Sequence, residues 1–197
     1  MIHPNTKIQY IDLRDGEPRY KTIDDLYKEY AHRSVDCYQE YSYITFDNRG
    51  IKITELAGWT DLLEIRKIAL NQLDIRWINL KFNNTEIKVS HTELIPAYES
   101  DKTIIGFHGE VKYLCTPKSP LHLSDNESVR THKYFEYTDE HAVEFIRPTG
   151  INIIINPDIT YGYQLITKSG FFNGNKIHLF ACEYDDKNKD ENNILYK

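Results

Sequence analysis

The chain has little of what marks secreted, zinc-binding or membrane-spanning proteins. Only three of its 197 residues are cysteines, and Cys37, Cys115 and Cys182 lie too far apart to form a CxxC pair. This spacing predicts neither a disulfide framework nor a zinc knuckle. The N-terminus has no apolar signal segment, and no apolar run is long enough to cross a bilayer. We therefore expect a protein that is not secreted by a classical signal and is not bound to a membrane.

Positive charge is also scarce. The sequence has 24 Lys and Arg residues against 30 Asp and Glu residues, for a formal net charge of -6. Lys and Arg side chains that neutralise phosphates supply much of the affinity of nucleic-acid-binding proteins, so nucleic acid is not an expected partner. A Gly-rich phosphate-binding loop and a Gly-x-Ser-x-Gly motif are lacking. The spacing of His108, His122, His132 and His141 fits no known metal site, and we expect neither a cofactor nor a bound metal.

Aromatic residues, by contrast, are plentiful, at 13% of the chain with 15 tyrosines. Tyr, Ile, Phe, Val and Thr suit the half-buried surface of a β-sheet, so the composition favours a mostly β fold. The length fits a single domain. We expect this domain to span residues 1–182, with a weakly patterned insertion at about 100–155 and a polar C-terminal tail at 183–197.

Local patterns predict the first elements of the chain. Alternation of apolar and polar residues predicts a strand over 6–13, and Asp15-Gly16 predicts a turn after it. Residues 22–30 have the pattern of a short helix that Thr22 caps, with apolar side chains on one face. Residues 59–73 are compatible with either a helix or a bent strand.

Hairpins are predicted over 41–56, 75–89 and 163–180. In each, β-forming residues flank a turn rich in Asn, Asp, Ser or Gly. Turns are expected at Ser169-Gly170 and again at Asn173-Gly174 in the last hairpin. The continuous apolar run at 151–155 predicts a buried strand.

Three segments resemble the conserved blocks of Hint domains, the fold of inteins and Hedgehog processing domains. Residues 1–8 resemble the opening of an intein, where a nucleophile precedes a strand. Residues 87–96 resemble the block that carries Thr-x-x-His, and residues 163–179 resemble the closing hairpin, which ends Asn-Gly-x-x-Val-His-Asn. The resemblance covers roughly residues 1–180, although 100–155 contributes little. It implies a twisted β fold with pseudo-two-fold hairpins and one or two short helices.

In the resembling family, a Cys or Ser at the first position attacks its own preceding carbonyl. A block His then protonates the departing nitrogen, and a final His assists cyclisation of a terminal Asn. Most of the matching positions here hold residues that cannot do this. Met1 has a thioether that cannot attack a carbonyl, Glu93 stands in place of the block His, and Leu179 stands in place of the Asn.

Three further positions belong to the same degenerate set. Ser90 stands where the family has Thr, Gln164 stands where an Asp often occurs, and His178 matches the penultimate His. The two ends of the family's domain meet at one site. The resemblance therefore implies that Met1 lies near His178 and Leu179, with Ser90 and Glu93 beside it.

The loss of the reactive groups predicts an inactive Hint-like domain, not an enzyme, that serves as a structural or protein-interaction module. Small free-standing proteins that resemble Hint domains occur in bacteriophage genomes, and the Asn, Ile, Lys and Tyr bias is typical of an AT-rich genome. Because the sequence starts at its own Met1, we expect a free-standing virion component, located in the host cytoplasm or the assembled particle. Its expected partners are other protein subunits, contacted through the loop at about 106–135 and the tail. The alternative is a self-processing domain that uses a non-standard nucleophile, Cys37 or Cys182.

Overall fold

The computed structural model describes most of the predicted domain. The described residues are 1–31, 36–38, 41–46, 50–56, 58–69, 76–91, 93–98, 119–122, 129–130, 132–138, 143–155 and 158–182. Most of the loop at 106–135 and the whole tail at 183–197, where partner contacts were predicted, lie outside this set.

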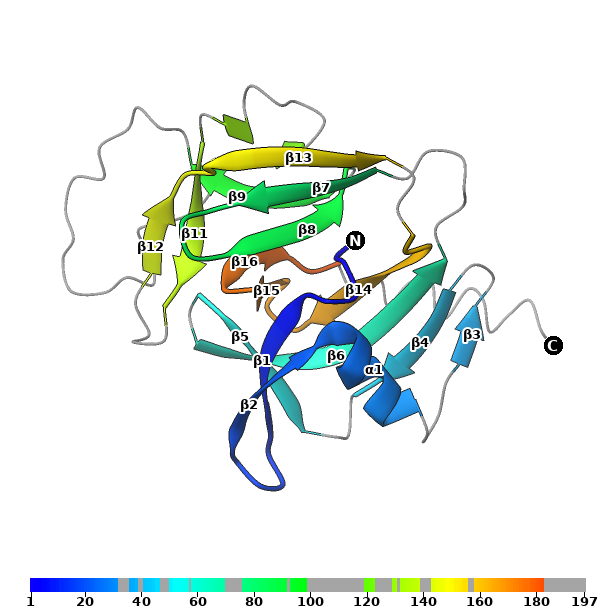
Figure 1. Ribbon diagram of the computed structural model, residues 1–197. Helices are drawn as coiled ribbons and strands as arrows, with labels where there is room; N and C mark the ends of the chain where they lie inside the picture. The colour runs from blue at the N-terminus through cyan, green and yellow to red at the C-terminus, as the bar shows by residue number, and fades with distance from the viewer. Residues whose placement is uncertain are drawn as a thin grey trace.

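The described part of the chain is mostly β, as the composition predicts (Figure 1). Its helix is α1 (Ile23–Ala31), and its strands are β1 (Lys7–Asp12), β2 (Pro18–Thr22), β3 (Asp36–Tyr38), β4 (Tyr41–Thr45), β5 (Ile51–Glu55), β6 (Gly58–Ala69), β7 (Arg76–Lys81), β8 (Glu86–Ser90), β9 (Leu94–Tyr98), β10 (Ser119–His122), β11 (Lys133–Tyr137), β12 (Val143–Ile146), β13 (Gly150–Ile155), β14 (Tyr161–Thr167), β15 (Phe171–Gly174) and β16 (Ile177–Phe180).

The strands form two antiparallel sheets within the described residues. The larger has 13 strands, with the main order β10-β9-β11-β16-β15-β1-β5-β6-β4-β3; β12 pairs with β11, β14 with β6, and β2 with β1. The smaller has the order β13-β7-β8. Strands far apart in sequence therefore lie side by side, and β1 pairs with both β5 and β15.

The helix confirms its sequence prediction. Thr22 caps it, because the Thr22 Oγ1 accepts a hydrogen bond of 3.1 Å from the backbone N–H of Asp25. The helix buries one apolar face, made of Ile23, Leu26, Tyr27 and Tyr30. Asp24, in its first turn, accepts hydrogen bonds from the hydroxyls of Tyr161 and Tyr163 at 3.2 and 2.7 Å. These bonds attach the helix to β14.

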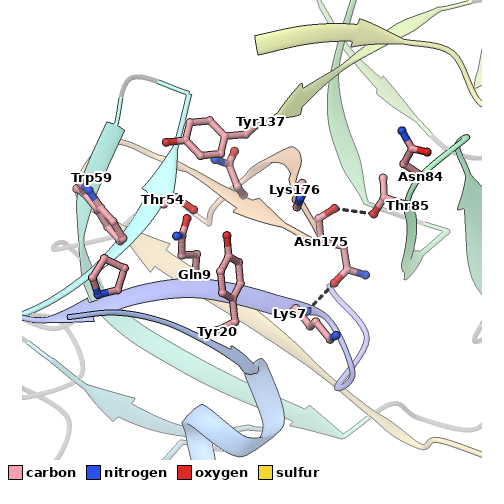
Figure 2. A pocket seen from close by; sticks show the side chains of 12 residues that line it. Lys7, Gln9, Tyr20, Thr54, Trp59, Asn84, Thr85, Tyr137, Asn175 and Lys176 are labelled. Carbon is pink, nitrogen blue, oxygen red and sulfur yellow. Dashed lines mark hydrogen bonds between the residues drawn. The ribbon is translucent and has the colours of Figure 1, made fainter. Parts of the chain in front are cut away.

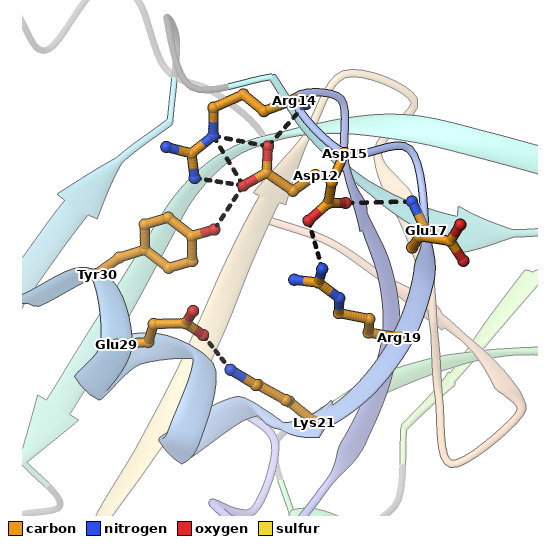
Figure 3. A network of polar contacts seen from close by, with 8 residues as sticks. All are labelled: Asp12, Arg14, Asp15, Glu17, Arg19, Lys21, Glu29 and Tyr30. Carbon is orange, nitrogen blue, oxygen red and sulfur yellow. Dashed lines mark hydrogen bonds and ion pairs between the residues drawn. The ribbon is translucent and has the colours of Figure 1, made fainter.

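A polar network joins the β1–β2 hairpin to the helix (Figure 3). Buried Asp12 accepts two hydrogen bonds from the Nε of Arg14, at 2.9 and 3.0 Å, and one of 3.3 Å from the hydroxyl of Tyr30. The bonds from Arg14 lower the pKa of Asp12 to about 2. On the surface of the same hairpin, Asp15 forms an exposed ion pair with Arg19.

The hairpin prediction for 75–89 is confirmed, since β7 pairs directly with β8. For residues 41–56, the two strands were predicted correctly, but the prediction that they pair with each other was wrong. Strands β4 and β5 both pair with the 12-residue strand β6, β5 along its start and β4 further along. The ambiguous segment 59–73 supplies β6, and its length allows it to take both partners.

The prediction for 163–180 also needs correction. Strand β14 pairs with β6, while β15 and β16 form the hairpin. Its turn lies at Asn175 and Lys176, whose φ values of 47° and 69° are typical of a two-residue type I′ turn. Gly174 is instead a strand residue, and a Cβ there would lie 2.8 Å from the Cγ2 of Thr6 and 3.0 Å from the Cδ1 of Leu179. Close packing, not turn geometry, requires this glycine.

The strand predicted at 151–155 exists as β13, but it is not buried. It lies at the end of the smaller sheet, and Ile153 and Ile155 are 45% and 66% exposed. A continuous apolar run cannot by itself distinguish a central strand from an apolar strand at a sheet end.

Candidate functional site

The N-terminal segment enters the fold as a bridge between strands β8 and β14, as Figure 1 shows. Ile2 forms antiparallel bridges with Val89 on one side and Tyr163 on the other. Its N–H donates to the Tyr163 carbonyl at 2.8 Å, and the Tyr163 N–H donates back at 3.0 Å. On the β8 side the N–H of Ser90 donates to the Met1 carbonyl at 2.9 Å. Three backbone hydrogen bonds therefore fix Met1 and Ile2 in the fold.

Met1, Ser90 and Glu93 come together at one point. The amino nitrogen of Met1 donates to the Oγ of Ser90 at 3.1 Å and forms an ion pair with a carboxylate oxygen of Glu93. The tight turn after β8 places Glu93, because its N–H donates to the Ser90 carbonyl at 2.9 Å. Burial lowers the pKa of the Met1 amino group to about 5, whereas the Glu93 carboxylate acts in the opposite direction by favouring the ammonium form.

Cys182 also reaches this point of the fold. Its N–H donates to the carbonyl of Leu165 at 2.8 Å, which lays the end of the described chain against β14. The Cys182 thiol and the Met1 amino group are close enough for each to affect the pKa of the other. Burial is the stronger influence on the thiol and raises its pKa. A thiol with a raised pKa is mostly protonated at neutral pH and is a weak nucleophile.

His178 and Leu179 lie in strand β16. Buried His178 stacks on Phe171 with ring centroids 5.0 Å apart, and its Nδ1 lies 3.3 Å from the Oδ1 of Asn173. Burial lowers the pKa of His178 to about 3, so the ring is neutral at pH 7. Leu179 is a core side chain, 1% exposed, that packs towards Gly174. His178 and Leu179 thus contact β15, and it is Cys182, four residues after His178, that lies near enough to Met1 to affect its pKa.

Gln164 lies on β14, opposite Arg66 of β6. Arg66 forms a hydrogen-bonded ion pair of 2.5 Å with Glu64, which is 2% exposed, and both residues influence the pKa of the Cys182 thiol. Sequence reasoning did not identify Glu64 and Arg66. The sequence feature that could have indicated this ion pair is the spacing of an acid and a base two residues apart within 58–69, because residues two apart lie on the same face of a strand.

A pocket of about 920 Å³ lies beside the β1–β2 hairpin and the β15–β16 turn (Figure 2), and none of Met1, Ser90, Glu93 and Cys182 lines it. Aromatic and amide side chains line it, among them Trp59, Tyr20, Gln9 and Asn173. Its volume lies towards the upper end of the range of small-molecule sites, roughly 300–1,000 Å³.

Within the described ranges, no group of three or more His, Cys, Asp or Glu side chains could hold a metal ion. Nor do these ranges contain a helix long and apolar enough to span a bilayer.

Comparison with known proteins identifies the fold. No protein-family model matches the sequence, and no curated protein matches it. Solved structures do match. An intein from a hyperthermophile aligns over 91% of this chain and 98% of its own with a TM-score of 0.70 and 13% identity. The transcription factor IIB Mvu mini-intein aligns over 91% and 98% with a TM-score of 0.66 and 12% identity. The TvoVMA intein aligns over 90% and 95% with a TM-score of 0.63 and 13% identity. The chain therefore has the Hint fold of inteins, as its three sequence blocks indicated.

Proposed function

We propose that this Hint-fold domain does not cleave itself and acts by binding other proteins, including the subunits of a bacteriophage particle. One observation carries the first half of the proposal. The place where β8, β14 and the N-terminal segment meet holds Met1, Ser90, Glu93 and Cys182. Among the described contacts, the Met1 amino group bonds to Ser90 and Glu93 and to no His, and the set contains no activated nucleophile. His91 follows Ser90 in the chain, but its buried Nδ1 has no hydrogen-bond partner within the described residues.

The register of the closing hairpin supports the same proposal. Aligned by sequence, the family's final His and Asn fall on His178 and Leu179. If the family's Asn-Gly is aligned instead with the observed turn at Asn175–Lys176, the match moves two residues along the chain, and the family's His and Asn fall on Phe180 and Ala181. In neither register does the chain supply an Asn whose side-chain amide could cyclise, so cleavage at this end has no chemical route of the family's type.

A second candidate function is self-processing through Cys182. The observation in its favour is that the thiol lies near the Met1 amino group. Against it, burial raises the pKa of the thiol and so keeps it protonated. The side chain of Cys37, the other nucleophile considered, lies outside the described residues, although its backbone is part of β3.

Intact mass decides between the two functions. The purified chain is incubated with a thiol plus a reducing agent, which cleaves a thioester formed at a Cys. A separate sample is incubated with hydroxylamine, which cleaves both a thioester at a Cys and an ester at a Ser. We expect the full mass to persist. The matched control is Cys182→Ala: a discrete fragment from the unaltered chain that this variant does not give would establish processing through Cys182. Glu93→His should not restore cleavage, because Met1 still supplies no nucleophile.

Binding of protein partners is tested by deletion of residues 184–197. If the polar tail is a contact segment, the truncated chain keeps its melting temperature and loses capture of particle subunits from an infected-cell extract. Capture by both forms alike would move the contact to another surface, such as the exposed Ile153 and Ile155 on β13. Failure of both forms to capture a particle subunit would contradict the virion role.

A further inference from the structure

The pocket beside the β1–β2 hairpin has the chemistry of a ligand site that the proposed function does not use. Two large aromatic side chains, Trp59 and Tyr20, line it and remain 36% and 52% exposed. Trp is on average a highly buried residue, so an exposed indole at the edge of a pocket requires an explanation. Figure 2 shows Trp59 and Tyr20 on either side of Gln9, so both rings can cover a ligand that contacts the amide.

Asn173 supplies a buried hydrogen-bond donor to the same pocket. The side chain is 3% exposed, it lines the pocket, and its Nδ2 has no hydrogen-bond partner within the described residues. Its Oδ1 lies 3.3 Å from the Nδ1 of His178. Because a carbonyl oxygen can only accept, the neutral His178 ring donates through Nδ1 and fixes the orientation of the amide. A buried donor without a partner costs roughly 1–3 kcal/mol. The Nδ2 is covered by its neighbours, so a ligand acceptor satisfies it only if the side chain turns towards the pocket.

Charge narrows the class of ligand. Lys7 and Lys176 line the pocket, and no Asp or Glu does. This contrasts with a chain whose formal net charge is -6. Lys176 also interacts electrostatically with Glu136, which does not line the pocket, so Lys7 is the stronger reason to expect an anionic ligand.

The backbone around the pocket disfavours an extended peptide. Peptides that bind by strand addition need an open sheet edge. Strand β1, which supplies Lys7 and Gln9, already pairs with β2, β5 and β15. The amide of Asn175 is also committed to the fold: its Oδ1 accepts from the Lys7 N–H at 2.6 Å and its Nδ2 donates to the Glu86 carbonyl at 2.7 Å. Recognition therefore depends on side chains, namely aromatic faces, amides and lysines.

We propose that this pocket binds an acidic saccharide. The apolar faces of the sugar rings pack on Trp59 and Tyr20, as is usual for aromatic side chains that line ligand sites. Sugar hydroxyls exchange hydrogen bonds with the amide of Gln9 and accept one from the Nδ2 of Asn173. The carboxylate or sulfate of the sugar pairs with Lys7 and Lys176. This site is distinct from the cluster around Met1, so the inference does not depend on the absence of self-cleavage.

Calorimetric titration of the full chain tests the proposal with three acidic probes: trigalacturonic acid, a heparin tetrasaccharide and 3′-sialyllactose. Maltotriose is the neutral control, and a hexaglutamate peptide is the control for a non-sugar anion. We expect at least one acidic sugar to bind, more tightly than maltotriose, and to weaken as salt is raised. Trp59→Ala should weaken it by about tenfold or more, the loss typical of removing one aromatic stacking partner.

Matched variants separate the pocket from general charge effects. Lys7→Gln should weaken binding several-fold, whereas Lys81→Gln, which removes an exposed lysine outside the pocket, should not. Asn173→Asp replaces the donor by a carboxylate of the same shape and should abolish binding. If this variant does not fold, Trp59→Ala and Lys7→Gln still test the pocket. The proposal is overturned if none of the three sugars binds at about 10 mM. It is also overturned if maltotriose binds as well as they do, or if hexaglutamate alone binds with the same dependence on Trp59 and Lys7.

Discussion

The buried His178 ring predicts a stability loss in mild acid. Burial lowers its pKa from an ordinary 6.5 to about 3 in the folded protein, whereas in the unfolded chain the pKa is ordinary. Between these values the unfolded state binds more protons than the folded state. The free energy of unfolding therefore falls as the pH drops from 6.5 towards 3, and no further below that.

The size of this effect follows from the shift. One pKa unit corresponds to about 1.4 kcal/mol, so the full window from pH 6.5 to about 3 contributes on the order of 5 kcal/mol. That is a large part of the roughly 5–15 kcal/mol by which domains are stable. Urea unfolding at a series of pH values, followed by tryptophan fluorescence, measures the free energy across the window.

His178→Gln is the decisive variant, because Gln can still donate to Asn173 and does not titrate. Between about pH 6.5 and pH 3, its free energy of unfolding should depend less on pH than that of the unaltered chain. The difference in slope should correspond to about one proton fewer taken up on unfolding. His3→Gln is the matched control. The pKa of His3 is lowered to about 4 by burial and by Lys88, so its removal should flatten the curve only above pH 4. Parallel curves for His178→Gln and the unaltered chain would show that His178 is not held neutral by burial.

Three other substitutions, two of them with a matched control, test an ion pair, the packing of a strand and a turn by urea unfolding. Asp12→Asn should lower the free energy of unfolding by about 1.5–3 kcal/mol, because it removes the charge from a buried set of hydrogen bonds. Asp15→Asn, in the exposed ion pair, should lower it by under about 0.5 kcal/mol. Equal losses in the two variants would contradict this reasoning. Gly174→Ala should cost about 1–3 kcal/mol through steric overlap, and Gly150→Ala, with 3.8 Å to its nearest neighbour, far less. Lys176→Gly should stabilise by about 0.5 kcal/mol, because φ there is 69°; a loss would show that the lysine side chain matters more than its backbone.

Local signals in the sequence predicted local structure well. The helix at 23–31 has its cap and its apolar face within one short segment, and the β7–β8 hairpin has its turn between its own strands. Pairing partners were not predictable in this way. Nothing in residues 41–56 indicates that β4 and β5 avoid each other, because the strand that separates them, β6, follows both in sequence.

Turn chemistry explains the error in the closing hairpin. Asn173-Gly174 is the stronger type I′ sequence, but the structure uses Asn175 and Lys176 for the turn. The glycine is needed in the strand, where Thr6 and Leu179 leave no room for a Cβ. A requirement set by residues far away in the sequence outweighs the local preference for the turn.

The candidate site was predictable only in part. The family resemblance named Met1, Ser90 and Glu93, which the structure brings together. Cys182 lies close enough to Met1 for each to affect the pKa of the other, and this follows from where the chain runs after β16, which no motif predicts. The saccharide pocket was not visible in the sequence at all, since its aromatic, amide and lysine side chains come from strands and turns between residues 7 and 176.

The bridge made by Ile2 has a consequence for synthesis on the ribosome. Ile2 pairs with Val89 and Tyr163, and β1 pairs with β15 at Gly174. During synthesis, the early residues of this domain must therefore wait for some of its late residues before they can complete their hydrogen bonds. Folding dominated by such distant pairings is slow and exposes unpaired strands in the meantime. The β1–β2 hairpin and α1, whose contacts are local, can form early and shield this segment until its partners arrive.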